Sequence, residues 1–152
     1  MPTIQKPTGP ITKFEGTYGF LSLEFPCEIM YNGETYSSAA VLFYAMRAEN
    51  KNSRRKIMNL SSNKARQKSA ALPPNPDYDE NREYYLEEAC RAKFESNTTL
   101  KAWLIKTAPV KLINTVTHRD TWIGVKADGK GSNMLGKVLM KIRDEYLASK
   151  SA

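Results

Sequence analysis

The chain has 152 residues, of which 41% are hydrophobic and 26% charged, and this composition suits one globular domain with its own core. Its net charge of +7 favours acidic or phosphate-bearing partners, and its two cysteines, Cys27 and Cys90, are too few and too far apart for a disulfide framework or a zinc site. No apolar run approaches the roughly 20 residues that span a membrane, and the N-terminus lacks a signal peptide, so we expect a cytoplasmic protein without metal, cofactor or membrane association.

The N-terminal quarter predicts an arm, a hairpin and a helix. Prolines and a glycine in the first dozen residues predict an extended arm over residues 1–16, followed by a domain over residues 17–150. Residues 27–31 and 34–37 flank Asn32-Gly33, a pair typical of tight hairpin turns, and predict two short strands. Ser37 or Ser38 predicts the cap of a helix that runs to about Asn50. The positions expected to face inward on this helix are Val41, Leu42, Ala45 and Met46.

A basic window follows, in which we expect short helices. Residues 51–68 contain no Asp or Glu and seven basic residues: Lys51, Arg54, Arg55, Lys56, Lys64, Arg66 and Lys68. A nucleic acid or another phosphate-rich ligand would be attracted to such a patch, and we expect Arg54, Arg55 and Lys56 to contact it. The alternative is a solvated helical surface without a partner.

Prolines at positions 73, 74 and 76 predict a loop that ends these helices. Asp79 and Glu80 predict the start of a longer helix that reaches about Glu95. Its buried stripe is expected to consist of Leu86, Ala89, Cys90 and Phe94. One more helix is predicted around Leu100, Trp103 and Leu104.

The C-terminal third predicts two short strands, over residues 111–116 and 121–125, and a strongly periodic helix after the cap residue Asn133. The buried face of this helix is expected to hold Leu135, Val138, Leu139, Ile142 and Tyr146. The glycine-rich loop 127–131 and the start of the helix are expected to aim backbone N–H groups outward, where they can hold an anion, unless the junction is only architectural. The predicted fold class is α+β, mostly α, with a small β-hairpin.

The chemistry-bearing residues exclude several enzyme classes. With one histidine, the sequence offers no pattern typical of a metal cluster or of a Ser-His-Asp triad. Carboxylates, amides and aromatic rings remain, and these can cleave an N-glycosidic bond, whose oxocarbenium-like transition state needs negative charge beside the anomeric carbon.

The order of several blocks resembles the NADAR family of YbiA-like proteins over residues 18–147. The blocks are Gly19-Phe20-Leu21-Ser22, the hairpin, the helix that opens with serine, Lys93-Phe94 with Asn97, Asp120-Thr121-Trp122-Ile123-Gly124, and the final stretch from Gly131 to Met140. The resemblance implies a single YbiA-like domain. It also implies hydrolysis of N-glycosides of ribose phosphates, either riboflavin-pathway intermediates or ADP-ribosyl adducts on guanine.

The same resemblance places Ala40 where the family has its catalytic Glu. The surrounding pattern is otherwise intact, which favours an engineered Glu-to-Ala inactivation. The alternative is a natural pseudoenzyme, in which Glu34 or Glu24 could act as a substitute carboxylate. Asp120 matches a family Asp and is expected to orient water or bind ribose hydroxyls. Losing a general acid or base costs about 10² to 10⁴ in rate, so substrate binding can outlast turnover.

Further positions are expected to bind substrate because they match family blocks. They are Phe20, Leu21, Ser22, Tyr44, Arg47, Lys64, Tyr78, Lys93, Trp122, Asn133, Gly136 and Lys137. Lys64 and Lys93 are candidates for phosphate contacts, and Tyr78 replaces a family Trp that packs against the base. Leu23, Asn114 and Ile123 depart from the family pattern, which weakens the assignment of the substrate.

Three functions remain open. The first is a glycohydrolase that removes ADP-ribose from guanine in DNA or other nucleic acid. Such an enzyme would counter a DarT-like toxin and so act as an antitoxin or an anti-defence protein. The basic window favours this function. The second is an N-glycosidase of riboflavin-biosynthesis intermediates, which needs no basic tract. The third is a non-catalytic module that binds ADP-ribose or a related nucleotide, suggested by Ala40. The oligomeric state is not predicted.

Overall fold

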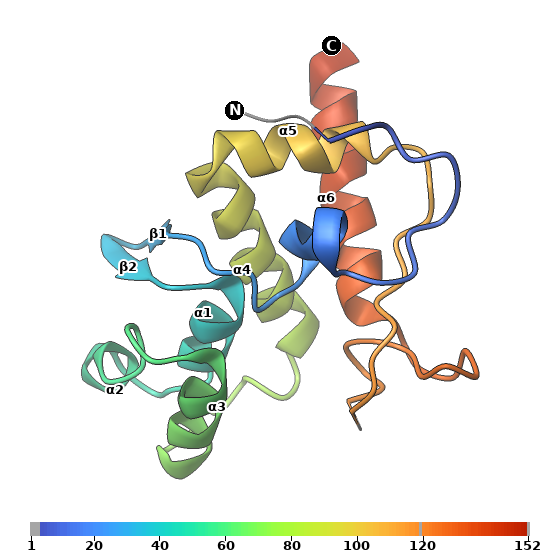
Figure 1. The fold of residues 1–152 in the computed structure, drawn as a ribbon. Coiled ribbons are helices and arrows are strands. Elements are labelled where there is room, and N and C mark those ends of the chain that lie inside the picture. Colours follow the sequence, from blue (N-terminus) through green and yellow to red (C-terminus); the bar gives the residue numbers. More distant parts are fainter. Residues whose placement is uncertain (1–3, 119, 152) are drawn as a thin grey trace. The chain divides into compact units, whose positions relative to one another are not determined.

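The computed structural model describes residues 4–118 and 120–151 (Figure 1). The elements in chain order are η1 (Gly16–Leu21), β1 (Ile29–Tyr31), β2 (Glu34–Tyr36), α1 (Ala39–Met46), α2 (Lys51–Arg55), α3 (Ser62–Ala71), α4 (Arg82–Ser96), α5 (Thr98–Lys106) and α6 (Met134–Ser151). This confirms the mostly helical α+β class; the short 3₁₀ helix η1 was not predicted. The chain divides into two compact units, of which one is Leu23–Asn97 and the other is formed by the segments on either side of it.

The predicted hairpin of the Leu23–Asn97 unit is confirmed, in a shorter form. Strands β1 and β2 pair antiparallel, with Ile29 opposite Tyr36 and Tyr31 opposite Glu34. Asn32 and Gly33 both have positive φ, at 50° and 80°, as the tight turn between twisted strands requires. Because each strand has only three residues, the hairpin is held by packing against α1 and α4 rather than by its own ladder.

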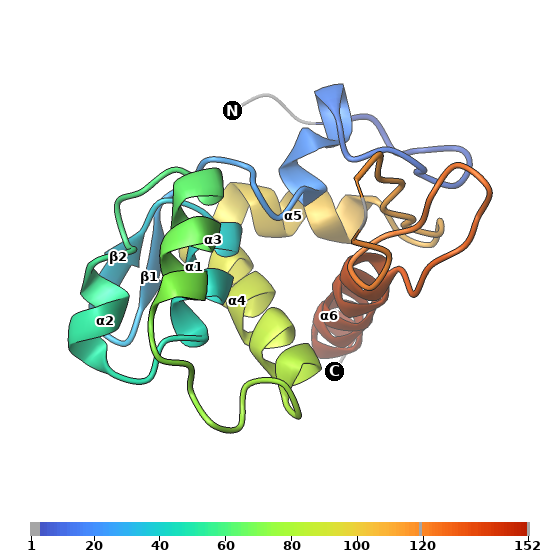
Figure 2. The same ribbon diagram turned by 90° about the horizontal axis from the view of Figure 1, so that it is seen from below.

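Helix α1 is the centre of the Leu23–Asn97 unit and packs against α3, α4 and the hairpin (Figure 2). The four positions predicted to face inward are buried, and so are Ala39, Ala40 and Phe43. The helix is shorter than predicted because the chain turns after Met46, where the Asn75 N–H donates to the Arg47 carbonyl and Asn50 begins α2 by accepting a hydrogen bond from the Ser53 N–H.

Helix α4 contains the predicted buried stripe, with Leu86, Ala89, Cys90 and Phe94 all buried. It begins at Arg82 rather than at Asp79, because residues 77–81 form turns in which the Asn81 N–H donates back to Asp77 and Tyr78. Lys93 is also buried on this helix, which the periodicity alone did not predict.

In the other unit, α5 packs against α6, and all five positions predicted for the buried face of α6 are buried. Ile4, Ile11 and Phe14, in the segment predicted as an arm, are buried within this unit, and Ile11 forms a parallel bridge with Leu112. Among the described residues, no helix is both long enough and apolar enough to cross a membrane.

The prediction of strands over residues 111–116 and 121–125 is wrong. These segments form only isolated bridges, one of which joins Thr115 and Val125. The reason is that residues 121–124 form a turn whose carbonyl groups accept hydrogen bonds from the start of α6, so they are not available for a strand ladder.

Candidate functional site

The start of α1, which carries position 40, is fixed by a serine cluster. The Ser38 hydroxyl accepts a hydrogen bond from the Val41 N–H at 3.1 Å and so caps the helix, as predicted. The same hydroxyl lies 3.4 Å from the hydroxyl of Ser62, the first residue of α3. Ala40 is fully buried, and its N–H donates to the Leu23 carbonyl at 2.8 Å. Position 40 therefore lies in a rigid corner beside the start of a basic helix.

Arg47, at the other end of α1, holds the unit together. Its Nη1 donates to the Ser69 carbonyl at 2.6 Å, and the Ser69 hydroxyl donates to the Tyr44 carbonyl at 2.8 Å. These bonds join the end of α1 to α3. Arg47 and Tyr44 were both predicted to bind substrate. In the structure, the Arg47 side chain and the Tyr44 carbonyl both take part in joining α1 to α3.

Tyr78 lies close to Tyr44 and Arg47, since both residues influence its pKa. Burial raises the pKa of Tyr78 to about 12, and the positive charges of Arg82 and Arg47 oppose that rise. The ring of Tyr78 is stacked on Tyr85, with centroids 5.5 Å apart and planes 13° apart, and it is only 6% exposed. As it stands, the face expected to pack against a base is covered by the protein itself.

The two lysines expected to contact phosphate differ sharply in environment. Lys64 is exposed on α3. Lys93 is 1% exposed, with its Nζ 5.6 Å from the centroid of the Phe25 ring and 5.3 Å from that of Phe94. Burial lowers the pKa of the Lys93 ammonium from 10.5 to about 8, while the nearby thiols Cys90 and Cys27 oppose this shift.

The three residues expected to contact nucleic acid do not share one environment. Lys56 is exposed, whereas the Arg55 Nε lies 3.6 Å from Glu34 Oε2 in an ion pair. Arg54 is half-buried and lines a cavity. The basic window is therefore divided between a solvated surface and an internal site.

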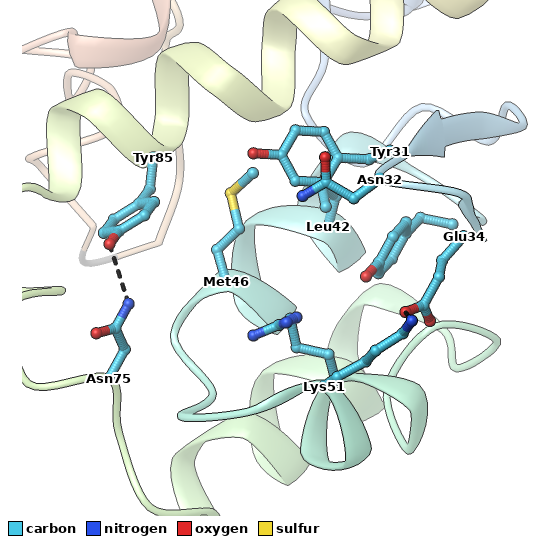
Figure 3. A pocket seen from close by; sticks show the side chains of 10 residues that line it. Tyr31, Asn32, Glu34, Leu42, Met46, Lys51, Asn75 and Tyr85 are labelled. Carbon is cyan, nitrogen blue, oxygen red and sulfur yellow. Dashed lines mark hydrogen bonds and ion pairs between the residues drawn. The ribbon is translucent and has the colours of Figure 1, made fainter.

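That cavity has a volume of about 260 Å³ and lies within the Leu23–Asn97 unit (Figure 3). Its walls come from the hairpin, α1, α2 and the residues before and within α4. The lining residues are Tyr31, Asn32, Glu34, Tyr36, Leu42, Met46, Lys51, Arg54, Asn75 and Tyr85. Among these residues, the sequence predicted Arg54 as a nucleic-acid contact and offered Glu34 as an alternative catalytic carboxylate. The tyrosines that flank Glu34 in the hairpin were a signal for the cavity itself.

In the other unit, two predicted binding residues belong to the core. Phe20 is 1% exposed and makes an edge-to-face contact with Trp103, with centroids 5.4 Å apart, and Leu21 is fully buried. Ser22 is half-buried and ends η1, where its N–H donates to the Gly19 carbonyl.

Asp120 organises the turn that follows it. Its Oδ1 accepts hydrogen bonds from the Trp122 N–H at 3.2 Å and the Ile123 N–H at 3.1 Å. Trp122 is half-buried. One carboxylate oxygen of Asp120 thus fixes the backbone of the turn.

At the start of α6 the structure favours the architectural alternative over an anion site. The N–H groups of Met134 and Leu135 donate to the carbonyls of Trp122 and Ile123 at 2.9 and 3.1 Å, so they do not point outward. Within the preceding loop, the Gly129 N–H donates to Lys126 and the Lys130 N–H to the Asp128 carboxylate. Both sets of donors are already satisfied by the protein, which is the architectural alternative.

Asn133 is not a helix cap of the expected kind. It has a positive φ of 49°, and its side chain spans to another loop, accepting from the Asn114 N–H at 2.8 Å and donating to the Leu112 carbonyl at 3.1 Å. A side chain at Gly136 would collide with the Leu112 carbonyl and with the Asn133 amide, which explains the glycine. Lys137 is exposed.

Replacing Asn133 by Ala should therefore lower stability rather than ligand affinity alone. The change leaves a backbone donor and acceptor without their partners, at a cost of about 2 to 3 kcal/mol in the free energy of unfolding. Urea denaturation measures this loss. Asn52→Ala, at an exposed position of α2, is the control and should change stability by less than about 0.5 kcal/mol; an equally small effect at position 133 would contradict the structural role.

Among the described residues, no group of three or more His, Cys, Asp or Glu side chains is placed to hold a metal ion. The candidate catalytic residues and the candidate binding residues are distributed over both units, each of which positions its own set through the bonds described above.

Comparison with known proteins gives a consistent result. The model of the NADAR domain matches residues 4–147. The N-glycosidase YbiA of Shigella boydii is 32% identical over 138 residues, which is 88% of this chain and 84% of that protein. The NMR structure of the Escherichia coli protein YbiA is similar with a TM-score of 0.82 and 28% identity, covering 99% of this chain and 95% of that one. A riboflavin biosynthesis protein of Vibrio vulnificus is 26% identical over 84% of this chain and 35% of its own length.

Proposed function

Since the chain belongs to the NADAR domain family, we propose that it is an N-glycosidase whose substrate is ADP-ribosylated guanine in nucleic acid, and that Ala40 leaves the present form inactive. The similar YbiA proteins are named N-glycosidases, which supports hydrolysis of an N-glycosidic bond. In the cytoplasm, such an enzyme would reverse modification of DNA by a DarT-like toxin and so act as an antitoxin or an anti-defence protein.

The observation that carries the nucleic-acid substrate is the placement of α3 beside the start of α1. The hydroxyls of Ser38 and Ser62 lie 3.4 Å apart, so a helix with exposed basic side chains begins next to position 40. Lys64 is in the first turn of α3, and Arg66 and Lys68 follow, all of them exposed. If the modified guanine of a nucleic-acid strand lies at position 40, the basic side chains of α3 attract the phosphates on either side of that guanine.

The chemistry at position 40 explains why binding is expected without turnover. Departure of the base from ribose leaves an oxocarbenium-like centre, which a carboxylate at this position would stabilise or supply with water. The methyl group of Ala40 does neither. The rest of the scaffold, from the Ser38 cap to Arg47, is ordered by its own hydrogen bonds and does not depend on that carboxylate.

Binding to DNA tests the substrate class. The double charge reversal Arg55→Glu and Lys56→Glu should weaken binding to a single-stranded oligonucleotide that carries one ADP-ribosylated guanine by about 10- to 100-fold. The slope of log affinity against log salt concentration should fall by the contribution of about two phosphate contacts. Binding to free ADP-ribose should change much less. Fluorescence anisotropy of the labelled oligonucleotide at several salt concentrations, with ADP-ribose as competitor, measures both.

The matched control is the reversal Lys106→Glu and Lys150→Glu, which changes the net charge by the same amount on α5 and α6. It should leave affinity for the modified oligonucleotide within a few-fold of the parent. Equal losses for both double variants, or equal losses for DNA and free ADP-ribose, would contradict a role of the basic window in DNA contact.

A second function is favoured by the similarity to the riboflavin biosynthesis protein of Vibrio vulnificus. An N-glycosidase of riboflavin-pathway intermediates would act on a small molecule and gain nothing from the basic window. Addition of unmodified DNA distinguishes the two proposals, because it should compete with the nucleic-acid substrate and leave hydrolysis of the small molecule unaffected.

A further inference from the structure

We propose that the cavity beneath the hairpin is a second binding site, for a small aromatic ligand that carries one oxyanion and one N–H donor. This inference is independent of the proposed function, because neither Ala40 nor Asp120 lines the cavity. It rests on three features of the lining: a cation, an acceptor, and rings between them.

The cation is Arg54. Helix α2 carries three basic side chains, of which Lys51 and Arg54 line the cavity. Lys51 and the exposed Arg55 both pair with Glu34: the Lys51 Nζ lies 3.8 Å from Oε1 and the Arg55 Nε 3.6 Å from Oε2. Arg54 is half-buried and forms no ion pair with a carboxylate among the described residues. Its guanidinium instead contacts the Tyr36 hydroxyl, whose pKa it lowers against the larger, raising effect of burial. A carboxylate or a phosphate is the natural partner of such a guanidinium.

The acceptor is Glu34. Its side chain is 12% exposed, and its Oε2 is buried without a hydrogen-bond partner among the described residues. The two ion pairs neutralise the carboxylate at distances too long for hydrogen bonds, so the lone pairs of Oε2 are not satisfied. A buried acceptor of this kind is costly unless a donor reaches it, and an N–H group of a ligand meets that need.

The rings belong to tyrosines on the hairpin and on α4 (Figure 3). Tyr31 and Tyr85 direct their hydroxyls to carboxylates, at 3.3 Å from Glu88 and 2.9 Å from Asp77, which fixes the rings in the wall. Leu42 and Met46, one turn apart on α1, supply an apolar surface. A volume of about 260 Å³ admits one aromatic ring with its acidic group.

Two sources supply this chemistry, namely aminoaromatic acids and nucleoside monophosphates, and the probes separate them. We expect 4-aminobenzoate or AMP to cause saturable shifts of the backbone amide NMR signals of β1, β2 and α2. Benzoate, which lacks the donor, should bind more weakly, and adenosine, which lacks the oxyanion, should not bind. Saturation by 4-aminobenzoate alone identifies the acid, and saturation by AMP alone identifies the nucleotide.

The variants test the two polar contacts. Arg54→Gln should weaken binding of either effective probe at least tenfold, whereas Arg55→Gln, the neighbouring arginine paired with Glu34 on the outside, should change it less than threefold. Glu34→Leu, which removes the acceptor, should abolish the preference for 4-aminobenzoate over benzoate. Thermal melts verify that each variant is folded.

The inference is overturned if none of the probes gives saturable shifts with the folded parent, or if the two arginine variants weaken binding equally, which would indicate surface charge alone. Because the readout is binding and not hydrolysis, these outcomes are independent of whether the chain can be made into an active glycosidase.

Discussion

Replacing Ala40 by Glu should convert the chain into an active N-glycosidase. Its hydrolysis rate should exceed that of the parent by a factor of about 10² to 10⁴, which is the usual contribution of a general acid or base. The expected reaction is release of free ADP-ribose from a single-stranded oligonucleotide that carries ADP-ribosylated guanine. Single-turnover assays with excess protein measure it, because they are independent of product release. A parallel assay with a riboflavin-pathway N-glycoside tests the second function.

The control for this gain is Ala40→Gln, which adds the same volume without a carboxylate. Ala40 is fully buried and its N–H is bonded to Leu23, so either side chain has to be accommodated, at a cost of about 1 to 3 kcal/mol in stability if the corner does not open. Activity of the Glu variant and not of the Gln variant assigns the effect to the carboxylate. If the folded Glu variant hydrolyses neither substrate, the enzymatic proposal loses its main support and a binding module is favoured.

Local sequence signals predicted the elements of this fold well where they act over a few residues. Asn32-Gly33 fixed the hairpin turn, Ser38 the start of α1, and the periodicity of Leu135 to Tyr146 the buried face of α6. The family blocks also marked Asp120 and Asn133, and in the structure both side chains bond to the backbone of the loops before α6.

The prediction failed where a distant segment changed the local outcome. Residues 121–124 have the composition of a strand, but their carbonyls accept the first N–H groups of α6, and the same bonds remove the expected anion site. The basic window also looked uniform in sequence, whereas Glu34, on a separate element, pairs with Lys51 and Arg55 and leaves Arg54 in a cavity. Such pairings depend on contacts between elements, which no local pattern contains.

Lys93 is the residue for which sequence and structure give different expectations. The family blocks suggest a phosphate contact, and the structure buries the side chain between aromatic rings. A folded-state pKa of about 8 means that the unfolded chain, with a value of 10.5, holds the proton more tightly. The charge on Lys93 therefore opposes folding below pH 8, by about 3 kcal/mol, and this penalty disappears as the pH rises from 8 to 10.5.

Lys93→Met, which keeps the length of the side chain and removes the charge, should consequently stabilise the protein by about 2 to 3 kcal/mol at pH 7. The difference between variant and parent should shrink between pH 8 and 10.5. Urea denaturation of both proteins at several pH values measures it, and comparison of the two cancels the opposite trend from Tyr78, whose raised pKa lowers stability as the pH rises.

Lys106→Met, at an exposed position of α5, is the control and should show no such dependence on pH. A loss of stability in Lys93→Met at every pH would mean that the ammonium makes favourable bonds inside the fold, which would contradict the penalty. Adding a phosphate ligand tests whether Lys93 binds oxyanions. A phosphate bound at Lys93 raises the pKa of the ammonium and should increase the stability of the parent but not that of Lys93→Met. If saturating ADP-ribose stabilises the parent more than it stabilises Lys93→Met, Lys93 makes the phosphate contact that the family blocks predict. The free energy lost by burying the ammonium then keeps a cation in position for the ligand.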